Sequence, residues 1–138
     1  MEQKRLPGLA TNYGTEKYYR WSQYDENSNL DVHHEHFKSV RGPSGDEDIK
    51  ISSLGIGTYM GDPDDLTDFA MYDAIKQSVL SGGLNHIDTA PNYRYMKSER
   101  VVGKILNTLH CKYGITRDQL HIATKAGYVP EDAETLTS

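Results

Sequence analysis

The sequence is poor in cysteine, in apolar residues and in long apolar runs. Its single cysteine, Cys111, excludes an intramolecular disulfide and a multi-cysteine zinc site, and it favours a reducing compartment. Apolar residues make up 36 % of the 138 residues, below the ~45–50 % of an ordinary globular domain. Part of the chain is therefore expected to form loops or an extension.

Basic residues are also too few for several function classes. The chain has 15 Lys and Arg against 20 Asp and Glu, a net charge of -5. Nucleic acids and anionic membranes both attract a basic face, so we expect no nucleic-acid partner and no membrane-surface role. No apolar run reaches the ~18 residues of a membrane span, and no secretory signal is readable. We expect a cytoplasmic protein without membrane insertion.

Residues 1–48 form a polar, tyrosine-rich N-terminal extension in our interpretation. Its aromatic residues follow no sustained helical or strand period; they are Tyr13, Tyr18, Tyr19, Trp21 and Tyr24. We expect one short helix or hairpin there, packed through these aromatics, and a turn at residues 42–48. The histidines of residues 33–36 lack the spacing that places two ligands on one helical face, so we expect a surface patch and no metal site.

Residues 49–138 alternate regularly between strand and helix signals. Predicted strands cover residues 49–58, 84–90 and 120–124. Between them, apolar residues recur at helical spacing, first at Phe69, Tyr72, Ile75 and Val79, then at Val101, Val102, Ile105, Leu106 and Leu109. Gly82 and Gly114 are expected to end the two helices, and Ser98 to cap the second.

This order predicts an α/β domain with parallel strands and right-handed crossovers. Three strands with helices on one side leave the other sheet face uncovered. The residues expected on this inward face of the sheet are Leu54, Ile87 and Ile122. We expect the domain to be incomplete, so that either a longer chain or another protein chain covers the open sheet.

The glycines of residues 55–61 suggest a dinucleotide-binding loop. Their spacing misses the G-x-G-x-x-G pattern by one residue, and the expected acidic ribose ligand is missing. A tight turn after a strand is the simpler interpretation.

Three polar residues follow consecutive predicted strands. Singly, Asp88 could cap a turn, Tyr93 could be a surface residue and Lys125 could point into water. Together they lie at the carboxyl ends of parallel strands, where α/β barrels build their active sites. An ammonium beside a phenol favours the phenolate, and a carboxylate keeps that ammonium in place. The set is typical of a tyrosine that gives a proton to a carbonyl oxygen.

At these residues the sequence resembles the aldo-keto reductase family. The resemblance is carried by residues 83–90, Tyr93 and residues 98–103, then by residues 117–127, and by residues 51–59. It covers about residues 49–130. It implies an NADP(H)-dependent (α/β)8 TIM barrel that reduces a small aldehyde or ketone or oxidises an alcohol. Arg94 departs from the family, because many members have glycine after the tyrosine.

The resemblance also implies roles for individual residues. Tyr93 would be the general acid, Lys125 would tune it and Asp88 would pair with Lys125. The implied cofactor-binding residues are Gly57, Thr58, Tyr59 and Asp88. Residues 49–138 would be the first three strands and two helices of the barrel, inactive by themselves. The alternatives are a non-catalytic reductase-like subunit of a larger assembly and an unrelated α/β fragment.

Overall fold

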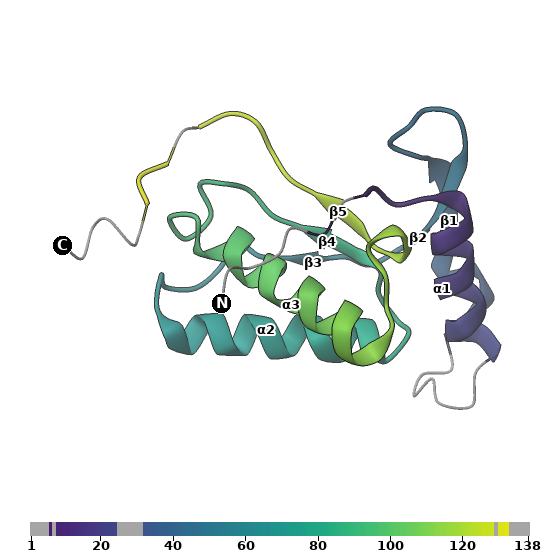
Figure 1. Cartoon of the computed structure of the whole chain (residues 1–138), viewed down its shortest axis with the longest axis horizontal. Helices are drawn as coiled ribbons and strands as arrows, with labels where there is room; N and C mark the ends of the chain where they lie inside the picture. The colour runs from purple at the N-terminus through teal and green to yellow at the C-terminus, as the bar shows by residue number, and fades with distance from the viewer. Residues whose placement is uncertain (1–5, 7, 25–31, 129, 133–138) are drawn as a thin grey trace.

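A parallel three-stranded sheet forms the centre of the molecule in the computed structural model, which describes residues 6, 8–24, 32–128 and 130–132. The strand order is β3 (Ile56–Gly57), β4 (His86–Asp88) and β5 (His121–Ala123). Helices α2 (Asp65–Leu80) and α3 (Lys97–Tyr113) connect the strands and cover one face of the sheet (Figure 1). The α/β class and the parallel pairing predicted from the sequence are confirmed.

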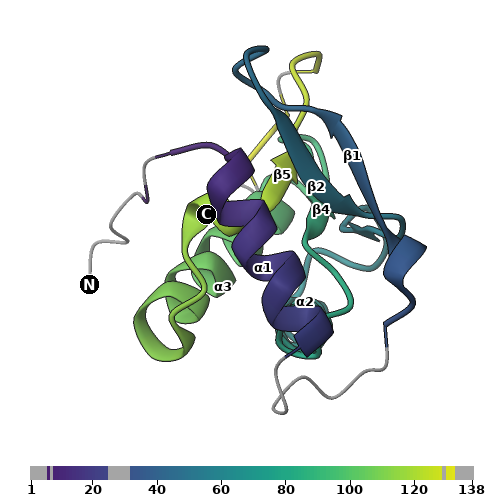
Figure 2. The same ribbon diagram turned by 90° about the vertical axis from the view of Figure 1, so that its right-hand side faces the viewer.

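The N-terminal segment contains both a helix and a hairpin. Helix α1 (Asn12–Tyr24) is followed by the short helix η1 (His34–His36) and by an antiparallel hairpin of β1 (Phe37–Arg41) and β2 (Asp48–Ser52). The predicted turn at residues 42–48 is the loop of this hairpin, apart from its last residue, which begins β2. Helix α1 lies across the end of the parallel sheet at which the strands begin, beside the hairpin (Figure 2).

The single strand predicted for residues 49–58 is wrong. Two strands of different sheets occupy this segment, because the chain bends after Ser52 and resumes an extended course only at Ile56. The first part pairs with β1, so the hairpin spans the predicted boundary between the N-terminal extension and the α/β domain.

Helix α2 ends where the sequence indicates, and an aspartate caps its start. The Asp64 carboxylate accepts a hydrogen bond from the Thr67 amide at 2.8 Å, and this bond lowers the pKa of Asp64. Ile75 and Val79 are buried, whereas Phe69 of the predicted apolar stripe is 72 % exposed. Gly82 follows the helix with φ 81°, a left-handed value that suits glycine.

Helix α3 carries the clearest apolar stripe of the chain. The buried residues of this stripe are Val101, Val102, Ile105 and Leu109. Gly114 ends it in the left-handed conformation. The predicted N-cap is wrong: Met96 caps the helix, and Ser98 lies inside its first turn. Ser98 is buried, and its hydroxyl donates to the Thr58 carbonyl at 2.6 Å.

The main core lies between the sheet and its helices. Ile87 is fully buried there, with Ile56 and Ile122 beside it on the flanking strands. The prediction that places Ile87 and Ile122 on the sheet face left open by the helices is therefore wrong. Because side chains alternate along a strand, His86 and Asp88 lie on that open face instead. Leu54 lies in the bend before β3 and is 68 % exposed.

A buried asparagine joins the hairpin to the parallel sheet. The Asn85 side chain accepts a hydrogen bond from the Ser52 amide at 2.9 Å and donates to the Lys50 and Gln119 carbonyls at 2.9 and 3.3 Å. Because these groups are buried together, the asparagine satisfies backbone atoms that a strand pairing would otherwise take up.

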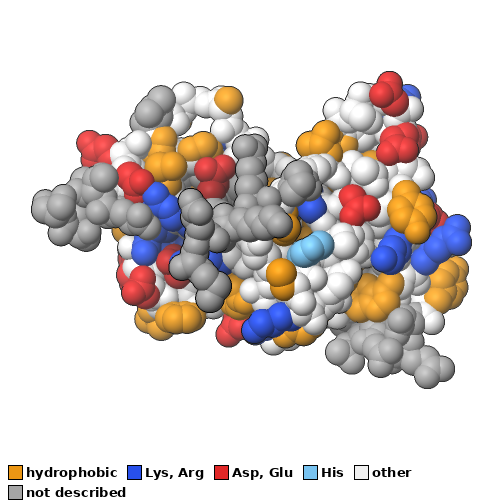
Figure 3. All heavy atoms as spheres, viewed as in Figure 1, with side chains coloured by type: hydrophobic (Ala, Val, Ile, Leu, Met, Phe, Trp, Pro, Cys, Tyr) orange, Lys and Arg blue, Asp and Glu red, His pale blue; other side chains and the backbone are white. Residues whose placement is uncertain are grey.

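The surface has mixed charge. Acidic and basic side chains are interspersed over the face drawn in Figure 3. Among the described residues, no helix is both long enough and apolar enough to span a membrane.

Candidate active site

The loops that follow the three parallel strands converge at one edge of the sheet. The register aligns Gly57 with Asp88 and Asp88 with Ala123, so the three strands end at the same level. Residues that follow each strand end are therefore brought close together. The carboxyl ends of the strands thus lie at the end of the sheet opposite α1 and the hairpin (Figure 1).

Asp88 and Lys125 form an ion pair at this edge. The Lys125 ammonium lies 2.7 Å from a carboxylate oxygen of Asp88 and also donates to the Thr89 carbonyl at 3.0 Å. The hydrogen bond to Asp88, and then one to Tyr93, raise the pKa of Lys125. The ammonium therefore stays charged across the neutral range.

Tyr93 lies beside this ion pair, on the loop that follows β4. The Lys125 nitrogen is 4.7 Å from the centroid of the Tyr93 ring, within the range of a cation–π contact. The ring of Tyr59 meets Tyr93 edge to face, with centroids 5.0 Å apart. The structure thus brings together all three residues that the sequence singles out for proton transfer.

The residues singled out for cofactor binding differ in accessibility. Gly57 is exposed, and a side chain there would meet no atom within 4 Å. Tyr59 is 64 % exposed. Thr58 is fully buried, and both its amide and its hydroxyl donate to the Asp88 carbonyl, at 3.1 and 3.0 Å. Thr58 therefore holds the end of β4 in place, whereas Gly57 and Tyr59 are exposed at the surface.

Sequence reasoning missed the buried contacts of Arg94. Its guanidinium lies in the fold with 1 % of the side chain exposed, paired with Asp68 of α2 at 2.6 Å. Its partner Asp68 lies 26 residues away in the sequence, and no local pattern links the two residues.

Two groups of histidines make contacts of their own. His36 of the 33–36 cluster bonds the Gly83 carbonyl at 2.6 Å and the Ser53 hydroxyl at 3.1 Å, so it is part of the packing between segments. His86 and His121 face each other with Nδ1 atoms 2.8 Å apart. Burial, then His86 and Arg117, lower the pKa of His121. The described part of the chain holds no group of three or more potential metal ligands.

Comparison with known proteins identifies the family. The profile of the aldo/keto reductase family matches residues 53–137. The chain belongs to the aldo/keto reductase family. The match includes Asp88, Tyr93 and Lys125 together with Gly57, Thr58 and Tyr59, and it excludes α1 and the hairpin.

Two curated reductases resemble the chain. The NADH-specific methylglyoxal reductase of Escherichia coli (strain K12) is 37 % identical over 99 residues, which cover 68 % of this chain and 28 % of the relative. The aldo-keto reductase YhdN of Bacillus subtilis (strain 168) is 36 % identical over 86 residues, 58 % of this chain and 23 % of the relative. The chain thus spans about a quarter of the length of either relative. No solved structure matches the chain.

Proposed function

We propose that this chain supplies the proton-transfer residues of a nicotinamide-dependent oxidoreductase that reduces an aldehyde or a ketone. The observation that carries the proposal is the meeting of Tyr93, Lys125 and Asp88 at the carboxyl ends of parallel strands. Family membership supports it, since the two curated relatives are reductases.

In the proposed mechanism Tyr93 is the general acid. When bound, the nicotinamide cofactor supplies the hydride that reaches the carbonyl carbon. As the electrons of the C=O bond move to oxygen, the Tyr93 hydroxyl donates its proton there, and the product is an alcohol. Lys125 stabilises the phenolate that remains, because its ammonium lies against the ring. Asp88 holds Lys125 through the 2.7 Å hydrogen bond.

The residues at the strand ends fit the nicotinamide end of such a cofactor. Gly57 leaves open space beside Asp88, so a flat ring can approach the backbone there. The exposed ring of Tyr59 offers an aromatic surface next to Tyr93. In this proposal Gly57, Tyr59 and Asp88 contact the cofactor, and Thr58 keeps Asp88 in register.

For the cofactor we propose NADP(H), and the E. coli relative makes NADH the competing choice, because it is NADH-specific by name. For the architecture we propose that residues 49–138 contain the first three strands, β3, β4 and β5, and the first two helices, α2 and α3, of an (α/β)8 barrel of ~250 residues or more. Residues 1–48 would be an extension outside the catalytic machinery.

The test is an activity assay on the protein at the full length at which it is expressed. Small aldehydes and ketones, methylglyoxal among them, are offered with NADPH and with NADH, and loss of the reduced cofactor is followed by absorbance. We expect carbonyl-dependent oxidation of NADPH faster than that of NADH. Folded protein that oxidises neither cofactor with any carbonyl would contradict the proposal, and faster turnover with NADH would contradict the cofactor choice.

A further inference from the structure

The loop that carries Tyr93 contains an unusual backbone conformation. Arg94, Tyr95 and Met96 have φ values of 52°, 53° and 70°, and none of them is glycine. In this left-handed region the Cβ atom comes close to the backbone, so successive residues with side chains rarely adopt it. Such a run persists only where surrounding contacts hold it.

The Arg94 side chain ties this run to neighbouring segments of the fold. Its Nε donates to the Asp62 carbonyl at 2.9 Å, and its Nη2 donates to the Asp64 carbonyl at 3.1 Å and to the Asp68 carboxylate at 2.6 Å. The guanidinium is almost fully buried, where charged hydrogen bonds are strong and a lost partner is costly. Arg94 therefore fastens the Tyr93 loop to the loop before α2 and to the first turn of α2.

These bonds also connect the two aromatic residues of the candidate site. Tyr93 precedes Arg94 directly, and Tyr59 lies on the loop whose Asp62 carbonyl accepts from Arg94. The two rings contact each other across these loops. Displacing one loop relative to the other would move Tyr93 away from Lys125, which reaches the site independently from β5.

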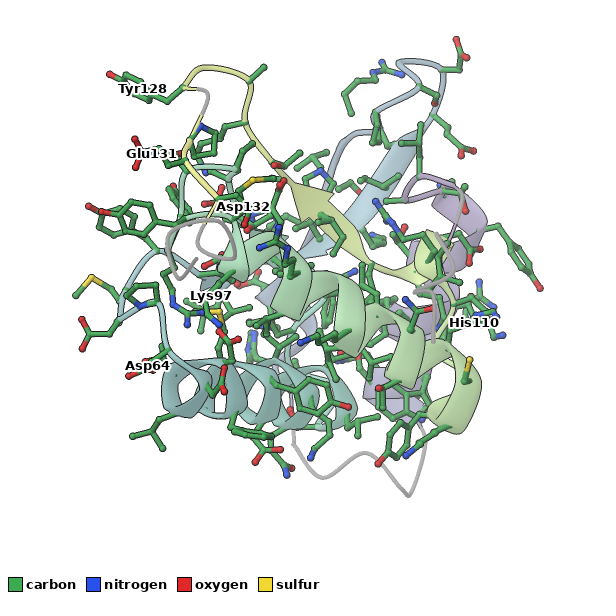
Figure 4. The ribbon with its side chains drawn as sticks, turned by 60° about the vertical axis from the view of Figure 1, so that its left-hand side comes forward. Asp64, Lys97, His110, Tyr128, Glu131 and Asp132 are labelled. Atoms are coloured by element: carbon green, nitrogen blue, oxygen red, sulfur yellow. The ribbon has the colours of Figure 1, made fainter. Side chains whose placement is uncertain are left out.

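A second cation contacts the same carboxylate from the start of α3. Lys97 lies 3.3 Å from Asp68 and 3.3 Å from Asp65. It is the first residue of α3 and follows the left-handed run, so its side chain ties the start of α3 to α2. Figure 4 shows Lys97 at the start of α3, near the end of α2 that Asp64 caps. Lys97 is therefore a matched control for Arg94.

We propose that Arg94 is a positioning residue that holds the Tyr93 hydroxyl in place relative to Lys125, through its buried bonds to Asp62, Asp64 and Asp68. The catalytic meaning of this placement rests on the proposed function, whereas the placement itself does not. A glycine at this position would adopt left-handed φ without such support.

The placement is tested first, without any assay of activity. Tyr93 in the full-length protein is replaced by 3-fluorotyrosine, and its fluorine resonance is recorded by NMR. We expect one narrow line in the wild type and in Lys97→Met, and a displaced or broadened line in Arg94→Ala. In Arg94→Gly the line should return toward the wild-type position, because glycine tolerates the conformation. An unchanged line in Arg94→Ala would overturn the proposal, whether or not the protein turns over a carbonyl.

The catalytic consequence is tested by kinetics on the same variants. Arg94→Ala should lower kcat about 10- to 100-fold, the scale of a misplaced catalytic group. The KM for the cofactor should stay within about 2-fold, since binding is not the step affected. Arg94→Gly should keep more activity than Arg94→Ala, and Lys97→Met should keep the wild-type rate. Equal losses in all three variants would indicate general destabilisation and overturn the positioning role. A silent wild type with the expected fluorine spectra would contradict the proposed function alone.

Discussion

At the scale of single residues, the Asp88–Lys125 pair matters because it places a positive charge beside Tyr93. Both side chains are nearly half exposed, so solvent screens their attraction and their contribution to stability is small. The raised pKa of Lys125, caused by its hydrogen bond to Asp88 and then by one to Tyr93, keeps a full positive charge beside the phenol. Substitutions here should therefore affect turnover far more than folding.

Under the proposed function, replacing Tyr93 by phenylalanine in the full-length protein should remove the proton donor. We expect kcat to fall at least about 100-fold, the usual scale for a general acid. Cofactor affinity, measured by fluorescence titration, should barely change because the ring remains. Tyr95→Phe is the matched control, since Tyr95 lies in the same loop and is 46 % exposed. Turnover near the wild-type rate in Tyr93→Phe would exclude Tyr93 from the mechanism.

Under the proposed function, replacing Lys125 by methionine in the full-length protein should alter the pH dependence of turnover. A general acid works only while protonated, so the rate falls above its apparent pKa. Loss of the neighbouring cation disfavours the phenolate, and the alkaline fall in kcat should move to higher pH while kcat itself decreases. Asp88→Asn should act in the same direction but less, because the ammonium remains. A pH profile that is unchanged in Lys125→Met would show that another group tunes the acid.

At the scale of helices and strands, the sequence predicts elements whose signals are local. The apolar spacing of α2 and α3 and the glycines that follow them are sufficient to place both helices. The sequence does not predict features that depend on partners distant along the chain. Strand β1 has one buried residue, Phe37, and four exposed ones, so its sequence does not indicate that it pairs with residues 48–52. Ser98 has the chemistry of an N-cap, but the left-handed backbone at Met96 starts α3 earlier.

Helix α1 is fastened to the sheet by a buried tyrosine. The Tyr18 hydroxyl lies 2.6 Å from the Val79 carbonyl and 2.8 Å from the Leu84 carbonyl, at the end of α2 and before β4. Tyr18→Phe would leave both carbonyls without this donor, so we expect the free energy of unfolding to fall by ~1–3 kcal/mol. Urea unfolding of the full-length protein measures the loss, and Tyr24→Phe, an exposed tyrosine on the same helix, is the control.

Tyr18 should also make stability depend on alkaline pH. Burial raises the pKa of Tyr18 in the folded protein, although the hydrogen bond with Leu84 acts the other way. Above pH ~10 an unfolded chain loses the phenol proton while the folded one keeps it. The contribution is therefore complete below pH ~10 and is lost as the pH rises toward the folded-state pKa. Tyr18→Phe should reduce this alkaline decline, and an identical decline in both proteins would contradict the assignment.

At the scale of the whole molecule, the candidate site was easier to predict than its support. Asp88, Tyr93 and Lys125 meet because parallel strands present their carboxyl ends at one edge, and the order of elements already implies this. The Arg94–Asp68 pair and the Asn85 contacts depend on side chains packing across the fold, for which the sequence has no period. The face of the sheet away from the helices carries His86, Asp88 and His121 and is therefore more polar than predicted.

The last prediction concerns the isolated chain of 138 residues. Under the proposed function, its described site offers Gly57, Tyr59 and Asp88 to the nicotinamide end of the cofactor. Both curated relatives are several times longer than the stretch that matches. We therefore expect NADPH to bind the isolated chain with a Kd no tighter than ~1 mM, about -4 kcal/mol.

The measurement should follow the fluorescence of NADPH rather than that of the protein. The single tryptophan, Trp21, lies in α1, at the end of the sheet away from the site, and would report binding poorly. The full-length protein is the positive control, and sedimentation alongside shows whether the isolated chain stays monomeric. Micromolar binding by a folded monomer of 138 residues would mean that these three strand ends hold the cofactor unaided. The barrel proposed around them would then be unnecessary for cofactor binding.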